Sequence, residues 1–199
     1  MNQKRRLIGL TGGIATGKST VSHYLAQTYQ FPILDADVYA KEAVLKDSPI
    51  LAQIVARYSP AILQSNGELD RGKLGEIIFQ DATEKAWLEA QIHPYVGQQF
   101  EKFLLYYRDP TIILAIPLLF EVDLTHLVTE IWVVYCSLDQ QKQRLMSRNH
   151  LTTEQAIARI HNQLPLAEKM AKADVILDNS GDLESLYQQI DQALQLKSS

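Results

Sequence analysis

The sequence predicts an α/β fold with a five-stranded parallel sheet, and three observations support this fold class. Five apolar runs of strand length occur along the 199 residues. Segments with helical periodicity separate these runs, which is typical of parallel sheets with helical crossovers on both faces. A glycine-rich loop follows the first run, at a strand end where such folds bind ligands. The runs are residues 7–10, 31–34, 111–116, 131–136 and 175–177.

The first run leads into the sequence GLTGGIATGKST at residues 9–20. Gly12, Gly17, Lys18 and Ser19 match the pattern G-x-x-x-x-G-K-[ST] of a phosphate-binding loop. In such a loop, backbone N–H groups turn inward around a di- or triphosphate. The lysine reaches the β- and γ-phosphates, and the serine hydroxyl completes the coordination of Mg²⁺. The pattern predicts a nucleotide site; the alternative is a flexible glycine-rich turn that matches by chance.

A helix is expected directly after this loop. Val21, Tyr24, Leu25 and Tyr29 recur at helical spacing from Ser19 onward. A strand before the loop and a helix after it form the context that a phosphate-binding loop requires. This context favours nucleotide binding over a chance match.

The second run ends in the sequence LDAD, which places Asp35 and Asp37 at the carboxyl end of a strand. Ligands of open α/β sheets bind outside these strand ends, so we expect both carboxylates beside the phosphate-binding loop. A carboxylate there can accept the proton of an attacking hydroxyl or hold magnesium through water. An ordinary helix N-cap is the alternative and would suit Asp37, but capping requires only one carboxylate.

About 75 residues separate the second and third runs, far more than one crossover requires. This length predicts an inserted helical subdomain at residues 38–110. Its helices are expected to begin at four signals, namely Ser48 before Pro49, Asp70, Asp81 with Glu84, and His93 before Pro94.

The third and fourth runs add one candidate site residue and one core residue. Glu121 follows the third run in IPLLFE, where it either binds substrate or caps a turn. The fourth run contains Cys136, the single cysteine of the chain. Its apolar neighbourhood predicts a core thiol.

The segment between the fourth and fifth runs, residues 139–172, is basic. It contains six basic and three acidic residues, a net charge of +3 in a chain whose net charge is −4. Arg144 and Arg148 are four residues apart, so they share one helix face and could both point at a triphosphate. A lid closing here would neutralise charge on the transferred phosphoryl group and exclude water. A solvated basic face is the alternative.

Composition argues against several other classes of protein. The net charge of −4 does not suggest nucleic-acid binding, and the short basic stretch Lys4, Arg5 and Arg6 is expected to be a solvated edge. The longest apolar run, 112–120, is far shorter than the roughly 20 residues of a membrane-spanning helix. The histidines lack zinc-site spacing such as H-E-x-x-H. With one cysteine and no secretory signal segment, we expect a cytoplasmic protein without an obligate protein partner or membrane association.

Seven segments carry a family resemblance: LIGLTGGIATGKST, ILDADVYAKEAV, LDRGKLGEIIF, EKAWLEAQIHP, IPLLFE, QRLMSRN and ADVILDNSG. Together they resemble the dephospho-coenzyme A kinases over nearly the whole chain. The DAD segment, the IHP segment and the closing ADVILDN are together specific to this family. The resemblance implies an enzyme that uses ATP and Mg²⁺ to phosphorylate the ribose 3′-hydroxyl of dephospho-coenzyme A, the last step of coenzyme A biosynthesis.

The resemblance also implies roles at the reacting groups. Asp37 would be the base acting on the ribose hydroxyl, and Asp35 would assist it. This chain has Ala15 and Thr16 where GGIGSGK is commoner, but both occupy variable positions of the loop. The ATP phosphates would be bound by Gly12, Gly13, Ile14, Ala15, Thr16, Gly17, Lys18, Ser19 and Thr20, with Ser19 as a Mg²⁺ ligand.

Further roles concern the lid, the acceptor and the adenine. Arg144 and Arg148 match the lid arginines of the family, and Asn179 falls where the loop after the last strand approaches adenine. Arg71 and His93 match the helices that hold the pantetheine-bearing substrate. The expected divisions are a nucleotide-binding core at 1–37, 111–138 and 173–199, an acceptor subdomain at 38–110, and a lid at 139–172.

Two alternatives share the phosphate-binding loop. A regulatory GTPase needs D-x-x-G after the third strand and N-K-x-D for guanine. The chain has D-x-x-G only at residues 178–181, after the last run, and it has no N-K-x-D. A nucleoside monophosphate kinase is the alternative among kinases and differs in its acceptor.

Overall fold

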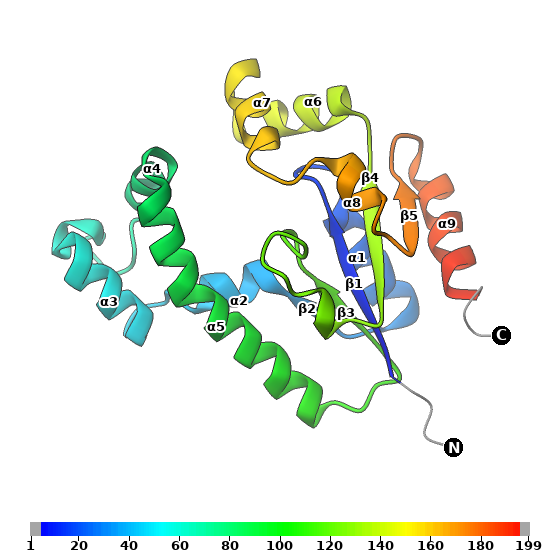
Figure 1. The fold of residues 1–199 in the computed structure, drawn as a ribbon, viewed down its shortest axis with the longest axis horizontal. Helices are drawn as coiled ribbons and strands as arrows, with labels where there is room; N and C mark the ends of the chain where they lie inside the picture. Colours follow the sequence, from blue (N-terminus) through cyan, green and yellow to red (C-terminus); the bar gives the residue numbers. More distant parts are fainter. Residues whose placement is uncertain (1–4, 196–199) are drawn as a thin grey trace. The chain divides into compact units, whose positions relative to one another are not determined.

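The computed structural model describes residues 5–195, which divide into two compact units (Figure 1). The first unit comprises Met1–Asp35 and Asp109–Ser199, and the second comprises Ala36–Arg108. Within the described residues, no helix is both long and apolar enough to cross a membrane.

The first unit is built on a five-stranded sheet, which confirms the predicted fold class. All neighbouring strands are parallel, in the order β2-β3-β1-β4-β5. Leu10 of β1 pairs with Ala115 of β3, and Gly12 pairs with Val134 of β4, so the carboxyl ends of these strands meet at one edge. The strands are β1 (Arg6–Gly12), β2 (Ile33–Asp35), β3 (Thr111–Ala115), β4 (Glu130–Tyr135) and β5 (Val175–Asp178).

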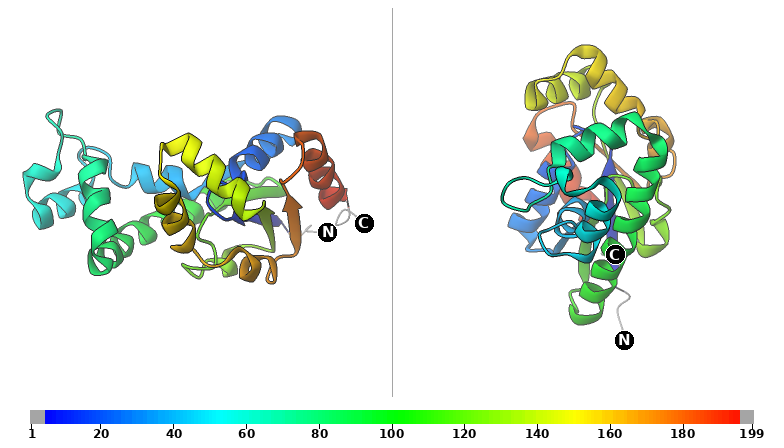
Figure 2. Two further views of the ribbon diagram at one scale, coloured as in Figure 1. Left: turned by 90° about the horizontal axis from the view of Figure 1, so that it is seen from above. Right: turned by 90° about the vertical axis from the view of Figure 1, so that its left-hand side faces the viewer.

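Helices cover both faces of this sheet (Figure 2). The helices α1 and α9 contact each other on one face, and α8 packs against β4 on the other. The remaining helices, α6 and α7, precede α8 in the basic segment. The bounds are α1 (Lys18–Tyr29), α6 (Leu138–Asn149), α7 (Thr153–His161), α8 (Leu166–Met170) and α9 (Leu183–Gln195), with the short 3-10 helix η2 at Thr125–Leu127.

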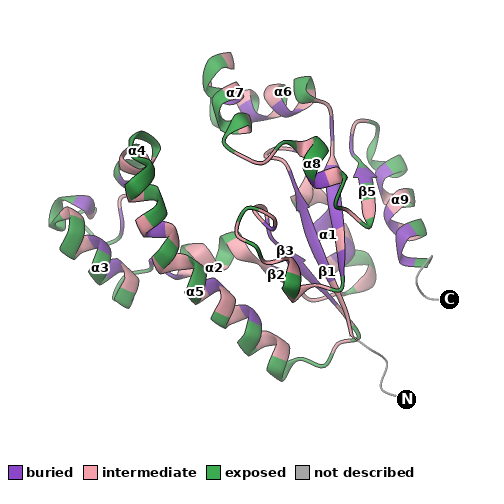
Figure 3. Cartoon of the chain, in the orientation of Figure 1, coloured by how far each residue is buried: buried purple, intermediate pink, exposed green. Residues whose placement is uncertain are grey.

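The apolar runs form strands because the sheet is buried on both faces (Figure 3). Ile8, Leu10, Trp132 and Val134 are fully buried and belong to a core that includes residues of α1 and α9. Cys136 is also buried, and burial raises the pKa of its thiol. The prediction of a core thiol is therefore confirmed.

Arg6 differs from the expectation of a solvated basic edge. Its guanidinium forms an ion pair with the buried carboxylate of Glu130. It also donates hydrogen bonds to the carbonyl oxygens of Ala193 and Leu194, at 3.2 and 3.3 Å. Arg6 therefore joins the start of β1 to the end of α9, because a buried carboxylate needs a charged partner. Lys4 lies outside the described residues.

The second unit is helical and has a core of its own, formed by residues such as Leu51, Ile54, Leu74 and Leu88. Three of its helices begin at the predicted caps. The side chain of Ser48 accepts from the N–H of Leu51, and those of Asp70 and Asp81 each accept two first-turn N–H groups. The elements are α2 (Ala36–Glu42), α3 (Pro49–Tyr58), η1 (Pro60–Ile62), α4 (Arg71–Gln80) and α5 (Ala82–Tyr106).

The prediction that a helix begins after His93 and Pro94 is wrong, because α5 continues through both residues. Pro94 has no N–H to donate to the carbonyl of Ala90, but both residues are exposed, so water can reach that carbonyl. Leu88 and Val96 are buried on either side of the proline. Their packing holds the two halves in one helix, and His93 lies exposed in its middle.

Candidate active site

The glycine-rich loop connects β1 to α1 and is packed too closely for larger residues. A Cβ atom on Gly12 would lie 2.6 Å from the carbonyl oxygen of Val134. Gly17 has a φ of 102°, and a Cβ atom there would lie 2.0 Å from the side-chain nitrogen of Asn179. Glycine is required at both positions, the second also because of its left-handed backbone.

Two carbonyl oxygens of this loop accept hydrogen bonds from side chains of other segments. The oxygen of Ile14 accepts from the side-chain amide of Gln141 at 2.8 Å, and that of Thr16 accepts from Asn179 at 2.7 Å. In a trans peptide the following N–H points the opposite way. The N–H groups of Ala15 and Gly17 are therefore directed away from these donors.

The loop also leads into the start of a helix. The first carbonyl of α1 to accept is that of its N-cap residue Gly17, from the N–H of Thr20 at 2.9 Å, so the N–H groups of Lys18 and Ser19 precede the hydrogen-bonded turns of the helix. These N–H groups and the positive end of the helix dipole attract anions. Together with the inward N–H groups of the loop, they form a cradle suited to the phosphates of a nucleotide.

A lysine and a carboxylate face each other beside this cradle. The Nζ atom of Lys18 lies 3.9 Å from Oδ2 of Asp35, the last residue of β2. The side chains are 15% and 32% exposed, so a ligand can reach both. Ser19 is exposed in the first turn of α1. The hydroxyl of Ser19 and the carboxylate of Asp35 are the hard oxygen donors that Mg²⁺ prefers.

Asp37 belongs to the second unit and is exposed in the first turn of α2. Because α2 begins at Ala36, Asp37 does not occupy the N-cap position that was its alternative role. It borders a cavity of about 330 Å³ between α2, α4 and α5. The charged residues of the lining are Asp37, Lys41 and Arg71, and the others are Ala40, Val44, Leu69, Leu74, Gly75, Ile78, Leu88 and Ile92.

This cavity is apolar inside and has charged groups at its rim, which is typical of ligand sites. The guanidinium of Arg71 donates to the carbonyl oxygen of Lys41 at 3.1 Å, which links α4 to α2. His93 is not among the lining residues but follows Ile92, which is. The structure therefore places Asp37 and Arg71 at one cavity, whereas His93 is exposed and does not line it.

The two arginines of the basic segment have different surroundings. The guanidinium of Arg144 donates to the carbonyl oxygens of Thr16 and Asn179, at 3.4 and 3.0 Å. Arg148 is exposed, and its Nε atom donates to the side chain of Asn149. Arg144 therefore contacts the phosphate-binding loop directly, whereas Arg148 does not share this contact.

Two other predicted site residues are engaged by the protein itself. Asn179 is buried, and its side chain supports the loop at Thr16. Glu121 forms an ion pair with Lys169, with a separation of 2.7 Å, and accepts from the N–H of Leu164 at 3.0 Å. Binding of adenine by Asn179 and of substrate by Glu121 both stay predictions.

Three residues around the loop escaped the sequence analysis. Gln141 holds the carbonyl of Ile14, and Gln163 accepts from the N–H of the same residue at 2.8 Å. Lys169 donates to the carbonyl of Gly12. All three lie in the basic segment, residues 139–172. Glutamine and lysine are also common on the solvent-exposed faces of helices, so nothing in the sequence marked these three as contacts of the loop.

Comparisons with known proteins agree with this geometry. The sequence profile of the dephospho-CoA kinases matches residues 6–185. The chain is 60% identical over 190 residues to a dephospho-CoA kinase of Trichormus variabilis, which covers 96% of this chain and 97% of that protein. A crystal structure from Thermus thermophilus is similar with a TM-score of 0.82, 32% identity and coverage of 98% and 99%. Dephospho-CoA kinase from Campylobacter jejuni is similar with a TM-score of 0.71, 28% identity and coverage of 96% of each chain.

Proposed function

The chain belongs to the dephospho-CoA kinase family, and on this premise we propose how its residues carry out the reaction. The protein catalyses the ATP-dependent phosphorylation of dephospho-CoA, the final step of coenzyme A biosynthesis. We propose that the acceptor is the 3′-hydroxyl of the ribose. The observation that carries the assignment of residues is the loop, whose carbonyl oxygens are held outward by Gln141 and Asn179.

The phosphates of ATP are assigned to this loop and to the start of α1. The N–H groups of Ala15 and Gly17 are fixed before the nucleotide arrives, so they stabilise negative charge without reorganisation, whereas the N–H of Ile14 already donates to Gln163. Lys18 supplies a mobile positive charge for the β- and γ-phosphates. The assigned residues are Gly12, Gly13, Ile14, Ala15, Thr16, Gly17, Lys18, Ser19 and Thr20.

Mg²⁺ is assigned to Ser19, with Asp35 in its surroundings. The fit rests on the accessible hydroxyl and carboxylate oxygens described above. When bound, the ion supplies positive charge next to the phosphate oxygens. Lys18, whose ammonium lies beside Asp35, contributes a second positive charge from the chain itself.

Asp37 is assigned as the base. It accepts the proton of the ribose hydroxyl while the 3′-oxygen forms a bond to the γ-phosphorus and the bond from that phosphorus to ADP breaks. Its exposed carboxylate at the rim of the cavity supports this role. Asp35 assists from the end of β2.

The second unit is assigned to the acceptor. The cationic side chains of Lys41 and Arg71 suit the phosphate groups of dephospho-CoA, and the apolar cavity wall suits its pantetheine arm. His93 and Glu121 are assigned as further contacts with this substrate. These assignments give residues 38–110 the role of an acceptor subdomain.

Residues 139–172 are assigned as a lid. The positive charge of this segment suits a triphosphate, and Arg144 already contacts the loop. Arg148 lies one helical turn from Arg144 on the same helix face. Its charge would act on the triphosphate when the segment closes over the nucleotide. Asn179 is assigned to the adenine side of the same site.

The cellular setting is also part of the proposal. A single buried cysteine suits a reducing cytoplasm, and a net charge of −4 offers little attraction to nucleic acid. We therefore assign the reaction to the cytoplasm, with dephospho-CoA and ATP as its partners and without an obligate protein partner.

The experiment that tests the acceptor measures ADP release with dephospho-CoA, AMP, UMP and CMP. Of the four acceptors, we expect only dephospho-CoA to be turned over. Its product should carry the new phosphate at the 3′-position, and phosphorus NMR distinguishes this product from the 2′-phosphate. Comparable kcat/KM for a nucleoside monophosphate would contradict the assignment. A 2′-phosphorylated product would overturn the proposed acceptor hydroxyl.

A further inference from the structure

Lys169 is a fully buried cation that the proposed mechanism does not use. An ammonium group has three N–H donors. The Nζ atom of Lys169 has three acceptors, namely Oε1 of Glu121 at 2.7 Å, the carbonyl oxygen of Pro117 at 3.2 Å and that of Gly12 at 3.4 Å. Every donor of this group is therefore satisfied inside the protein.

Such an arrangement is not explained by stability alone. Burying a charge is unfavourable unless it is paired, and apolar residues of similar volume are often equally or more stabilising than a buried ion pair. The carboxylate of Glu121 offsets the charge of Lys169, but its side chain is 21% exposed and reaches water. The position of the ammonium, rather than its contribution to folding, is the feature to explain.

Lys169 lies where two neighbouring strands end. Gly12 is the last residue of β1, and Pro117 follows β3 by two residues. The hydroxyl of Thr11, next to Gly12, donates to the same carbonyl of Pro117 at 3.0 Å. Lys169 and Thr11 thus fasten the base of the phosphate-binding loop to the segment after β3.

The contact with Gly12 acts on the first peptide of the loop. Because the Gly12 carbonyl points at Lys169, the N–H of Gly13 points the opposite way. The carbonyls of Ile14 and Thr16 are held in the same manner by Gln141 and Asn179. Lys169 completes a set of donors that act on alternate peptides.

Glu121, the ion-pair partner of Lys169, also supports a second contact with the loop. Glu121 accepts from the N–H of Leu164, and the neighbouring Gln163 accepts from the N–H of Ile14. The ion pair of Glu121 with Lys169 therefore holds both ends of the segment 163–169 against the loop.

We propose that Lys169 is a positioning residue for phosphoryl transfer: it sets the direction in which the phosphate-binding loop leaves the sheet, and touches neither substrate. The proposal rests on the assignment of the ATP phosphates to this loop. Losing this contact should weaken ATP binding and slow turnover, because the N–H groups lose their fixed orientation.

The test compares three variants with the wild-type enzyme. Lys169→Met keeps an unbranched side chain of nearly the same length and removes the charge. Lys169→Met combined with Glu121→Gln removes both charges, so it leaves no unpaired carboxylate if the single variant folds poorly. Lys102→Met is the control for the same substitution, because Lys102 is exposed on α5 and does not line the cavity of the second unit.

The measurements are ATP affinity by calorimetry, kcat, KM for each substrate, and thermal unfolding. We expect both Lys169 variants to bind ATP about tenfold more weakly, as loss of a hydrogen bond from a charged donor predicts. The kcat of both variants should fall. KM for dephospho-CoA should stay within about twofold in Lys169→Met; it is not compared in the double variant, because Glu121 is itself assigned to that substrate. Lys102→Met should match the wild type within about twofold throughout.

A merely structural role predicts a different result. The melting temperature and the calorimetric stoichiometry would fall, but the folded fraction would bind ATP with wild-type affinity, and this outcome would overturn the proposal. Wild-type protein that fails to bind ATP at all would instead refute the assignment of the loop. The two failures are therefore distinguishable.

Discussion

The side-chain amide of Asn179 donates a hydrogen bond to the carbonyl oxygen of Thr16, with a distance of 2.7 Å. Asn179 directly follows β5, whereas Thr16 lies in the loop that follows β1. The bond turns the Thr16 carbonyl outward and so directs the N–H of Gly17 toward the opposite side. The last strand of the sheet thereby contributes to the geometry of a loop near the start of the chain.

This contact gives a prediction that separates two roles of Asn179. If the side chain mainly supports the loop, Asn179→Ala should weaken the binding of ATP and of inorganic tripolyphosphate by a similar factor, about tenfold. Inhibition by tripolyphosphate and calorimetry with ATP measure the two affinities. A loss confined to ATP would show that Asn179 contacts adenine instead, because tripolyphosphate has no base.

The second prediction concerns Asp35 and Asp37. If Asp37 is the base, Asp37→Asn should lower kcat by about 10²–10⁴-fold while ATP affinity changes little. Asp35→Asn should raise the Mg²⁺ concentration needed for half-maximal activity, since Asp35 lies beside Lys18 at the phosphate cradle. Steady-state kinetics with Mg²⁺ titrations decide between them, and the reverse pattern would exchange the two roles.

The third prediction contrasts Arg144 with Arg148. Arg144→Ala should lower kcat by about 10²-fold and also weaken ATP binding, because its guanidinium contacts the Thr16 carbonyl directly. Arg148→Ala should lower kcat with little change in ATP affinity, because its charge would act only in a closed lid. Lysine should restore little at either position, since it lacks the planar guanidinium.

These arginine variants are compared by single-turnover kinetics and calorimetry. Near wild-type rates for Arg148→Ala would identify its surroundings as a solvated basic face. Unchanged ATP affinity in Arg144→Ala would mean that the contact with Thr16 contributes nothing to the ground state.

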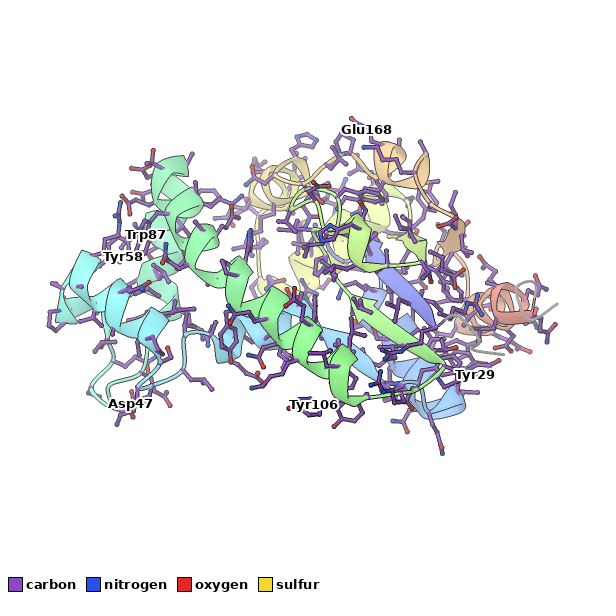
Figure 4. All side chains as sticks on the ribbon, turned by 60° about the horizontal axis from the view of Figure 1, so that its bottom comes forward. Tyr29, Asp47, Tyr58, Trp87, Tyr106 and Glu168 are labelled. Carbon is purple, nitrogen blue, oxygen red and sulfur yellow. The ribbon has the colours of Figure 1, made fainter. Side chains whose placement is uncertain are left out.

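The fourth prediction concerns the pH dependence of stability in the second unit. The carboxylate of Glu84 accepts from Arg57 at 2.6 and 2.7 Å and from the hydroxyl of Tyr58, which packs edge-on against Trp87 (Figure 4). Hydrogen bonds from Arg57, and then from Tyr58, lower the pKa of Glu84 from 4.5 to about 2. The folded state therefore binds this proton less readily than the unfolded state.

Because the folded pKa is the lower one, the stabilisation is complete above pH 4.5 and is lost as the pH falls toward 2. Glu84→Gln should lower the urea midpoint clearly at neutral pH and progressively less as the pH falls below 4.5. Circular dichroism during urea titration measures this difference. Glu76→Gln, at an exposed position of α4, is the control, and an equal deficit of Glu84→Gln at all pH values would contradict the assignment.

The strands were predictable because their burial demands uninterrupted apolar residues. The helix starts at Ser48, Asp70 and Asp81 were predictable because a cap is a local hydrogen bond between a side chain and the next turn. The prediction of a helix start after Pro94 was wrong because it considered only the local effect of a proline. Packing of Leu88 and Val96 on either side keeps the helix continuous.

The residues of the candidate site also fall into two groups, those predictable from local sequence and those positioned by long-range packing. Gly12, Gly17 and Lys18 are a contiguous pattern whose chemistry depends on neighbours in sequence. Gln141 and Lys169 support that loop from positions 127 and 157 residues away from their acceptors, and such contacts depend on how the segments pack. A single sequence carries no local signal for them.

The pairing of β1 has a consequence for the order in which the parts of the chain can fold during synthesis. Its neighbours are β3, at Thr111–Ala115, and β4, at Glu130–Tyr135, and its first residue is tied to Ala193 and Leu194 near the end of α9. The helices of Ala36–Arg108 are contiguous and have a core of their own, so they can fold while the ribosome is still extending the sheet. The strand made first must therefore wait, unpaired and apolar, for partners that emerge roughly a hundred residues later.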